Sequence, residues 1–261
     1  MAGMLDGKTA IIYGGGGGIG AGVASTFARE GARVFLVGRT KRTLEAAAKD
    51  IKGGGGSVDV AVVDALDEEA VDGHVQDVVS RAGRIDVSFN LITRGDVQGV
   101  PLVQMRADDL LRAVTTGLRS NFITARAAGR KMIEQKSGVI LHLNSASGEA
   151  AMPGMGSTGP ADAATESFMR YLAAELGPHG VRVCGIWTAG VADTLSEEKM
   201  KAVNDNVPDL SRVKEMLANM SVLRRNVRLG DVAEAAAFLA SDRAAGITGT
   251  MVNVTSGLVL K

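Results

Sequence analysis

The chain has 261 residues, a length that suits one α/β domain with a large core. Its 29 lysines and arginines equal its 29 aspartates and glutamates, so its charge indicates neither a nucleic-acid nor a membrane partner. It has no long uncharged apolar run and no cationic start followed by an apolar stretch, which predicts a soluble cytoplasmic protein. Cys184 is the only cysteine, and the three histidines lack metal-ligand spacing, so neither a disulfide nor a metal site is expected.

Residues 8–39 predict a strand, a helix and a second strand joined by a glycine-rich turn. Thr9–Tyr13 is a short apolar, β-branched run, typical of a buried parallel strand. Gly14–Gly20 follows with six glycines and one isoleucine. Residues 21–30 have apolar side chains at helical spacing, and residues 32–38 predict the next strand.

Glycines between a strand and a helix suit the binding of a pyrophosphate. A backbone without Cβ atoms can make the tight turn and lets the phosphates approach closely. The N–H groups of the first helical turn and the helix dipole then interact with the phosphate charge. A flexible low-complexity loop is the alternative interpretation of the same residues.

Arg39 bears on the choice of dinucleotide. It lies after the second predicted strand, about 20 residues beyond the last glycine, where this fold binds the adenosine ribose. An acidic residue there would bind the 2′-hydroxyl of NAD, but residues 38–42 read Gly-Arg-Thr-Lys-Arg. Cations suit a 2′-phosphate, so we expect NADP(H) in preference to NAD(H). The alternative is a solvated basic loop.

The rest of the chain alternates strands with helices, which predicts a doubly wound parallel sheet in three αβα layers, the Rossmann fold. One NAD(P)-binding domain is expected over residues 1–261, with a substrate-side insertion at about 191–226 that holds short helices. Strands are predicted at 58–63, 85–92, 138–143, 181–187 and 250–254, and helices at 43–51, 68–82, 108–134, 161–176 and 232–241.

Over nearly its whole length the chain resembles the short-chain dehydrogenase/reductase family. The turn matches the family's T-G-x-x-x-G-I-G with Tyr13 in place of threonine, Asp64 matches the acid that the family places on the adenine, and Ile247–Val254 resembles its C-terminal strand. The resemblance implies cofactor contacts at Gly14, Gly16, Gly18, Ile19, Gly20, Arg39, Asp64, Ala65, Asn90, Leu91, Thr188, Gly190 and Val191. It also implies a homodimer or homotetramer formed through the two long helices and the C-terminal strand.

The family's catalytic pattern is only partly present. Its serine falls on Ser145 and is kept, whereas its catalytic asparagine falls on Gly117. The tyrosine and lysine of its Tyr-x-x-x-Lys motif fall on Thr158 and Asp162. The resemblance therefore implies a catalytic site at Ser145, Thr158 and Asp162 with altered chemistry.

Thr158 cannot simply replace the tyrosine as a proton donor. A phenol has a pKa of about 10, which a nearby cation can lower, whereas a hydroxyl as weak as that of water ionises near about 15.7. A carboxyl in an apolar cleft can stay protonated and act as an acid, which makes Asp162 and Glu166 candidates. We expect His142 to face a helix layer and Tyr171 to pack in the core or an interface.

Three functions are compatible with this pattern. The first is an NADP(H)-dependent oxidoreductase with an atypical active site, acting on an apolar carbonyl or alcohol. The second is a catalytically inactive protein that binds a nucleotide or another ligand and serves as a partner subunit, and the third is non-redox chemistry in the same cleft. Methionines predicted on the substrate side suit an apolar substrate, but gap-filling in the insertion is the favoured interpretation of them: Met152, Met155, Met200, Met216 and Met220.

Overall fold

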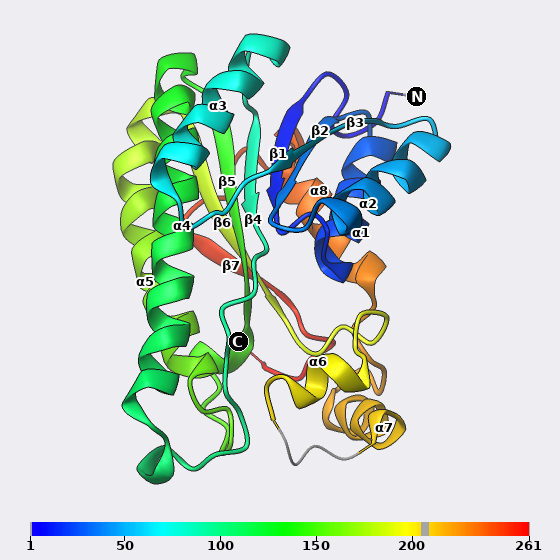
Figure 1. The fold of residues 1–261 in the computed structure, drawn as a ribbon, viewed down its shortest axis with the longest axis vertical. Coiled ribbons are helices and arrows are strands. Elements are labelled where there is room, and N and C mark those ends of the chain that lie inside the picture. The colour runs from blue at the N-terminus through cyan, green and yellow to red at the C-terminus, as the bar shows by residue number, and fades with distance from the viewer. Residues whose placement is uncertain (1, 205–208, 261) are drawn as a thin grey trace.

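The computed structural model describes residues 2–204 and 209–260, and its centre is one parallel sheet (Figure 1). Among these residues seven strands pair in the order β3-β2-β1-β4-β5-β6-β7. The order reverses direction at β1, which lies between β2 and β4, and so creates a switch point at the C-terminal ends of these strands. The strands are β1 Thr9–Tyr13, β2 Arg33–Gly38, β3 Ser57–Val62, β4 Val87–Asn90, β5 Gly138–Ser145, β6 Val181–Thr188 and β7 Thr250–Val254.

Helices cover both faces of the sheet, which makes three layers (Figure 1). One face carries α1 Gly18–Arg29, α2 Lys41–Gly53 and α8 Leu229–Ala240, and the other carries α3 Glu68–Ala82, α4 Ala107–Gln135 and α5 Thr158–Leu176. Short single turns lie at Leu102–Gln104, Ala146–Gly148, Gly177–His179 and Asp242–Ala244.

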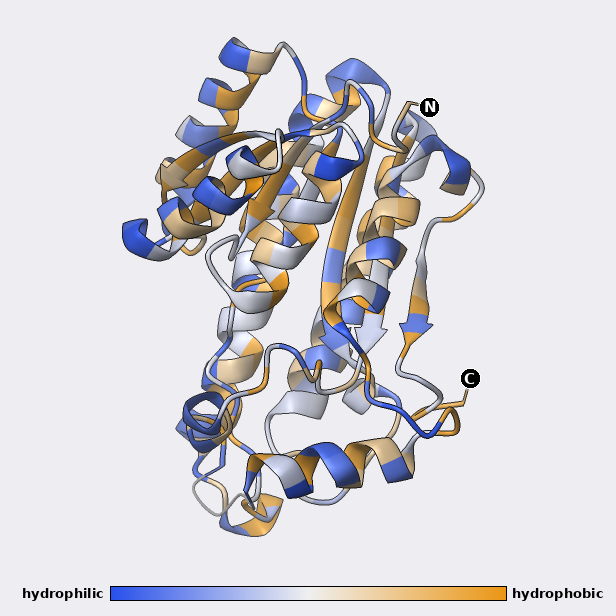
Figure 2. Cartoon of the chain, turned by 90° about the vertical axis from the view of Figure 1, so that its right-hand side faces the viewer, coloured by the Kyte–Doolittle hydropathy of each residue, from blue (hydrophilic) through white to orange (hydrophobic). Residues whose placement is uncertain are grey.

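The core consists of two apolar layers, one on each side of the sheet. Successive residues of a strand point to opposite faces, so Ile11 joins the layer beneath α3 and α4 while Ile12 joins the layer beneath α1 and α8. Both are fully buried, as expected of strands covered on both faces. In Figure 2 the central strands are coloured mainly hydrophobic, whereas the surrounding helices mix both kinds of residue.

The predicted fold class is confirmed, and the main differences lie at the boundaries of elements around the site. Helix α5 begins at Thr158 instead of the predicted Ala161, because Pro160 is tolerated in a first turn, where its missing N–H has no intrahelical partner. Strand β5 continues to Ser145, past the predicted end at Leu143, because it stays paired with β6 to that point.

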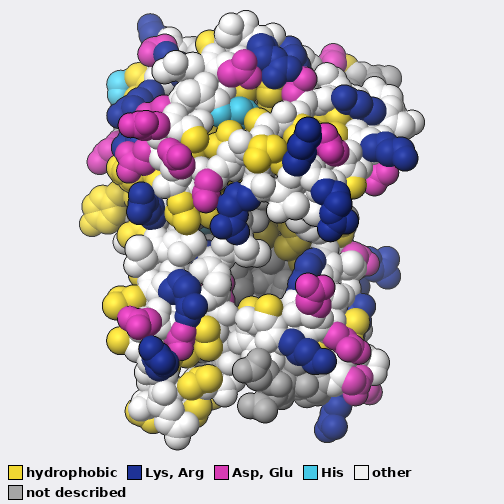
Figure 3. Space-filling view, in the orientation of Figure 1, with side chains coloured by type: hydrophobic (Ala, Val, Ile, Leu, Met, Phe, Trp, Pro, Cys, Tyr) yellow, Lys and Arg dark blue, Asp and Glu magenta, His cyan; other side chains and the backbone are white. Residues whose placement is uncertain are grey.

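Two short helices, α6 Glu197–Lys201 and α7 Leu210–Met220, lie beyond the C-terminal ends of the strands (Figure 1). They fall within the predicted insertion, of which residues 205–208 lie outside the described residues. The molecular face in Figure 3 is hollowed near its centre, between the sheet and this region. Within the part of the chain that the structure describes, no helix has the length and apolar composition needed to cross a bilayer.

Candidate cofactor cleft and active site

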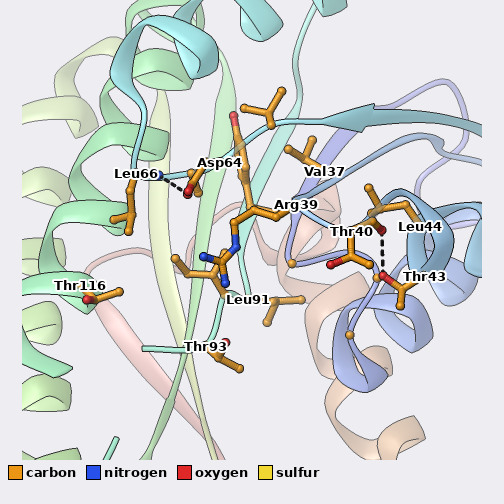
Figure 4. Close-up of a pocket in the computed structure, with 18 residues that line it drawn as sticks. Val37, Arg39, Thr40, Thr43, Leu44, Asp64, Leu66, Leu91, Thr93 and Thr116 are labelled. Carbon is orange, nitrogen blue, oxygen red and sulfur yellow. Dashed lines mark hydrogen bonds between the residues drawn. The ribbon is translucent and has the colours of Figure 1, made fainter. Parts of the chain in front are cut away.

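A cleft of about 250 Å³ opens at the C-terminal ends of β1, β2 and β4, at the switch point of the sheet. The glycine-rich turn forms one wall, and the segments that follow β2, β3 and β4 form the others (Figure 4). Predicted cofactor residues that line it are Gly14, Gly16, Arg39, Asp64, Ala65 and Leu91. Lining residues that sequence reasoning missed include Thr43, Leu66 and Thr116, which belong to no motif.

The shape of the turn requires glycine at two positions in particular. Gly14 has a φ of +78°, and a Cβ there would lie 2.5 Å from the carbonyl oxygen of Leu91. A Cβ on Gly20 would collide with the carbonyl oxygen of Gly14. The glycines therefore set a tight backbone turn that leaves the wall of the cleft free of side chains.

The first turn of α1 adds unpaired donors to this wall. Its N-cap residue, Gly17, provides no side-chain hydrogen bond, and no acidic residue lies in the first turn. The N–H groups at the start of a helix have no intrahelical partner, and the helix dipole attracts negative charge there. The donors present and the shape of the wall thus fit the pyrophosphate of a dinucleotide.

Arg39 and Asp64 both line this cleft, just after the ends of the neighbouring strands β2 and β3. Figure 4 shows the Arg39 side chain extending into the cleft from the end of β2. The Asp64 carboxyl accepts the backbone N–H of Leu66 at 3.0 Å, which fixes its position at the end of β3 (Figure 4). Arg39 is the cation expected near the ribose, and Asp64 is the acid for which the resemblance implies a contact with the adenine.

Several predicted cofactor residues lie outside the walls of the cleft. The Asn90 side chain is turned inward, because its Nδ2 donates to Thr124 Oγ1 at 3.3 Å. Val191 is buried against Val227 and Val232. Gly18, Ile19 and Gly20 lie in the first turn of α1, and Thr188 and Gly190 lie at and just after the end of β6. Their contacts with a cofactor stay a prediction.

A second group of polar side chains lies where β5 ends and α5 begins. Ser145 is the last residue of β5, and its Oγ donates to Asp162 Oδ2 at 2.5 Å while accepting the backbone N–H of Ser147 at 3.2 Å. Asp162 is 0% exposed, whereas Ser145 is half-buried. The serine is therefore partly open to solvent, whereas the carboxyl that it contacts is enclosed.

Arg94, between β4 and α4, provides the counter-charge of this carboxyl. Its Nη1 lies 2.7 Å from Asp162 Oδ1 and its Nη2 lies 3.0 Å from Asp96 Oδ1. Burial raises the pKa of Asp162 to about 6, although Arg94 and the hydrogen bond from Ser145 act in the opposite direction. A carboxyl with this pKa can exchange a proton close to neutral pH.

Arg94 reaches Asp162 by crossing α4 at Gly117. A Cβ on Gly117 would lie 2.6 Å from Arg94 Cδ, so the arginine occupies space that a side chain at 117 would need. The glycine at 117 and the carboxyl at 162 are therefore parts of one arrangement. Sequence reasoning missed Arg94, and the signal that could have found it is charge balance, because a buried carboxylate needs a cation.

Thr158 lies beneath the same segment after β4. It is 4% exposed, and its Oγ1 accepts a hydrogen bond from Gln98 Nε2 at 3.0 Å. The backbone N–H of Val97 donates to Ser157 Oγ at 2.9 Å, so this segment follows the first turn of α5. Thr158 thus lies one helical turn before Asp162, and its hydroxyl is already bound by Gln98.

The second carboxyl considered as an acid, Glu166, has a different setting. Its Oε1 accepts hydrogen bonds from Trp187 Nε1 at 2.8 Å and from Asn144 Nδ2 at 3.2 Å. The side chain is 3% exposed and makes no contact with Ser145 among the described interactions. Glu166 therefore joins α5 to β5 and β6, and Asp162 is the carboxyl that the structure places at the serine.

His142 and Tyr171 are both remote from the serine. The ring of His142 is buried on the α5 side of the sheet, with its Nδ1 3.1 Å from the carbonyl oxygen of Cys184, as expected for a histidine facing a helix layer. Burial lowers the pKa of His142 to about 4, so it is neutral at physiological pH. Tyr171 is 72% exposed on the outer face of α5, so the core half of its prediction was wrong, and its place in an interface stays a prediction.

A parallel sheet with a glycine-walled cleft at its switch point defines a dinucleotide-binding protein of the Rossmann type. The profile of the family described as enoyl-(acyl carrier protein) reductase matches residues 15–259. The chain therefore belongs to the short-chain dehydrogenases/reductases, a family of oxidoreductases.

Known relatives agree with this assignment. The 3-oxoacyl-(acyl-carrier-protein) reductase of Chlamydia trachomatis serovar D is 32% identical over 259 residues, which cover 99% of this chain and 100% of the relative. Carveol dehydrogenase from Mycobacterium avium, crystallised in complex with NAD, is 26% identical with a TM-score of 0.91 and covers 99% of this chain and 100% of that one. A 7α-hydroxysteroid dehydrogenase, crystallised with NADH and 7-oxo glycochenodeoxycholic acid, is 27% identical with a TM-score of 0.84, covering 98% and 96%. These likenesses imply a nicotinamide cofactor.

Proposed function

We propose that this protein is an NADP(H)-dependent oxidoreductase that interconverts an apolar carbonyl compound and its alcohol through an atypical active site. The proposal rests on the 2.5 Å hydrogen bond between Ser145 and the buried Asp162, in a chain whose dinucleotide cleft is intact. Bound NADP(H) supplies or accepts the hydride. The glycine-rich turn would hold its pyrophosphate, and Asp64 its adenine.

Asp162 and Ser145 form the route for the proton. In reduction, protonated Asp162 gives its proton to Ser145 Oγ while the serine gives its own proton to the substrate oxygen. In oxidation the same protons move in reverse, and ionised Asp162 is the final acceptor. The serine is the member of the pair that substrate can reach, because Asp162 is 0% exposed. Above about pH 6 the ionised form prevails, which favours oxidation of the alcohol.

The preference for NADP(H) rests on Arg39. Its guanidinium enters the cleft, where a cation would pair with the 2′-phosphate (Figure 4). A cytoplasmic location and a homodimer or homotetramer complete the proposal. Support for assembly comes from α4 and α5, whose outer surface exposes Phe122 at 42% and Tyr171 at 72%, because such aromatic side chains suit an interface.

An apolar substrate is supported by the surroundings of the site and by the names of relatives. Met216 and Met220 on α7 are each 48% exposed, and Met152 and Met155 line a groove of about 550 Å³ beside the start of α5. The relatives described above are named for carveol and for a hydroxysteroid, alcohols on largely hydrocarbon skeletons.

A catalytically silent nucleotide-binding protein is the second candidate. It is favoured because the polar groups of the site already have partners. Asp162 accepts a hydrogen bond from Arg94, and Thr158 accepts one from Gln98. Such a protein would keep the cleft and bind nucleotide without transferring hydride.

One experiment separates the two candidates. Titration calorimetry measures the binding of NADPH and NADH, and absorbance at the nicotinamide band then follows turnover with cyclic ketones and alcohols for wild type and Ser145→Ala. The proposed function predicts tighter binding of NADPH and a turnover that Ser145→Ala reduces at least about 100-fold. Nucleotide binding without turnover in either direction would support the silent protein, and no heat with either nucleotide would contradict both.

A further inference from the structure

The ion pair between Arg94 and Asp162 depends on a third position, Gly117 in α4. A Cβ there would lie 2.6 Å from Arg94 Cδ and 3.4 Å from Arg94 Cγ, and real Cβ atoms essentially never come within 3.0 Å of such a neighbour. A glycine inside this 29-residue helix destabilises the helix relative to alanine. The missing side chain at Gly117 leaves room for the side chain of Arg94.

The arginine that passes here is bound to two carboxyls. Its Nη1 donates to Asp162 Oδ1 at 2.7 Å, and its Nη2 donates to Asp96 Oδ1 at 3.0 Å. The side chain is 13% exposed, so these interactions lie largely out of water. Because Arg94 holds Oδ1, the other oxygen, Oδ2, is the one that meets Ser145 Oγ at 2.5 Å. The two oxygens of Asp162 are thus divided between the arginine and the serine.

We propose that Arg94 is a positioning residue for the reaction, which orients Asp162 toward Ser145, and that Gly117 is the slot through which it does so. This inference rests on the proposed function, because the proton route through Asp162 is part of that function. Arg94 itself does not touch substrate in this account. A purely structural role for Arg94 would change stability but would leave the proton transfer of the folded protein unchanged.

The charges that face Asp162 predict how its titration responds to Arg94. The segment after β4 contributes Arg94 and Asp96, and the helix that carries Asp162 contributes Glu166 one turn further on. β5 contributes the uncharged Ser145. Without the arginine, the charged groups left on these elements are acidic, so Asp162 would keep its proton to a higher pH.

The test compares Arg94→Met, Arg94→Lys and Gly117→Ala with two matched controls. Arg33→Met removes an arginine from another ion pair, with Asp59 at 2.9 Å, at the opposite end of the sheet. Gly73→Ala changes a helical glycine that has open space around its Cβ position. The readouts are kcat and KM for carbonyl reduction from pH 5 to 8, and the titration of the Asp162 carboxyl followed by carbon-13 NMR.

We expect Arg94→Met to lower kcat about 100-fold with little change in KM, because misplaced catalytic groups cost about that much. The kcat of Arg94→Met for reduction should also begin to fall at a higher pH than that of the wild type, because Asp162 would keep its proton to a higher pH. Arg94→Lys should recover part of kcat, and Gly117→Ala, which removes no charge, should change kcat in the same direction as Arg94→Met. Both controls should behave as wild type. Wild-type kcat and an unchanged pH profile in Arg94→Met would overturn the proposal.

The NMR titration tests the role of Arg94 independently of whether the protein turns over a substrate. If the wild type shows no turnover, the function fails, yet Asp162 should still titrate at a higher pH in Gly117→Ala and Arg94→Met than in wild type or Gly73→Ala. If Arg94→Met does not fold, Gly117→Ala and Arg94→Lys carry the comparison. An Asp162 carboxyl that titrates at the same pH in every folded variant would show that Arg94 does not position it.

Discussion

The nucleotide cleft and the Ser145 site are built in different ways. The cleft is formed by backbone: Gly14 and Gly20 leave no room for side chains, and α1 presents its first-turn N–H groups. The Ser145 site is formed by side chains from distant segments, since Arg94 and Asp162 are 68 residues apart in the chain. The nucleotide cleft keeps the glycine pattern of the family, whereas the Ser145 site departs from the catalytic pattern that the resemblance implies.

In the Ser145 site, the departures from the family pattern fit one another. A buried carboxylate without a partner is strongly destabilising, by about 3–5 kcal/mol. Asp162 instead has Arg94 at 2.7 Å, and the arginine in turn needs the absence of a side chain at Gly117. A folded but inactive protein would need the same compensation for its buried carboxylate, so measured turnover decides whether the arrangement works as an active site.

The largest effect is expected from Asp162→Asn, which removes the proposed proton donor while keeping its shape. General acids contribute about 100-fold to 10,000-fold, so kcat for carbonyl reduction should fall within that range. Calorimetry should find NADPH binding within about threefold of wild type, because Asp162 lies outside the cleft. A variant that retains wild-type kcat would remove Asp162 from the mechanism.

Two buried groups, Asp162 and His142, should make the stability depend on pH, and their effects should have opposite directions. The folded pKa of Asp162, about 6, lies above its unfolded value near 3.9, so its contribution to stability falls as pH rises from about 4 to 6. The folded pKa of His142, about 4, lies below its unfolded value near 6.5, so its contribution is lost as pH falls over nearly the same range. Each amounts to about 3 kcal/mol.

These two contributions largely cancel in the wild type. Between about pH 4.5 and 6, both groups differ in protonation between the folded and the unfolded state. In this interval the free energy of unfolding of Asp162→Asn, measured with urea, should rise with pH. His142→Gln should show the reverse slope over the same interval. Equal slopes in both variants would mean that neither group titrates in the folded protein as described.

In the cleft, Gly20→Ala should weaken NADPH binding about 100-fold, or about 2.7 kcal/mol, because its Cβ would collide with Gly14 and distort the turn. Gly73→Ala, in a helix with open space, is the control and should bind normally. Calorimetry measures both. Normal binding by Gly20→Ala would show that the turn does not shape the phosphate site.

A smaller effect is expected from Arg39→Met. Loss of one charged hydrogen bond costs about 1.5–3 kcal/mol, so NADPH binding should weaken about tenfold or more while NADH binding stays within about twofold. Lys41→Met is a control from the same loop, since Lys41 pairs with Glu45 on the exposed surface at 3.6 Å. Equal losses for both nucleotides would assign Arg39 no role in recognising the 2′-phosphate.

The difference between the two regions also explains what the sequence could predict. The order of strands and helices and the position of the cleft follow from local patterns, such as Thr9–Tyr13 and its following glycines, and the structure agrees with them. The positions of Ser145 and Asp162 were found only because they align with a motif. Arg94 and Gln98 lie in a loop without periodicity, and their contacts with α5 span 68 and 60 residues, so no local pattern could place them.

The most direct test is the pH dependence of kcat for the wild type in both directions. As pH rises, carbonyl reduction with NADPH should fall and alcohol oxidation with NADP⁺ should rise through the same apparent pKa near 6, the value that burial sets for Asp162. Rates that do not change between pH 5 and 8, or nucleotide that binds without any turnover, would contradict the proposed mechanism.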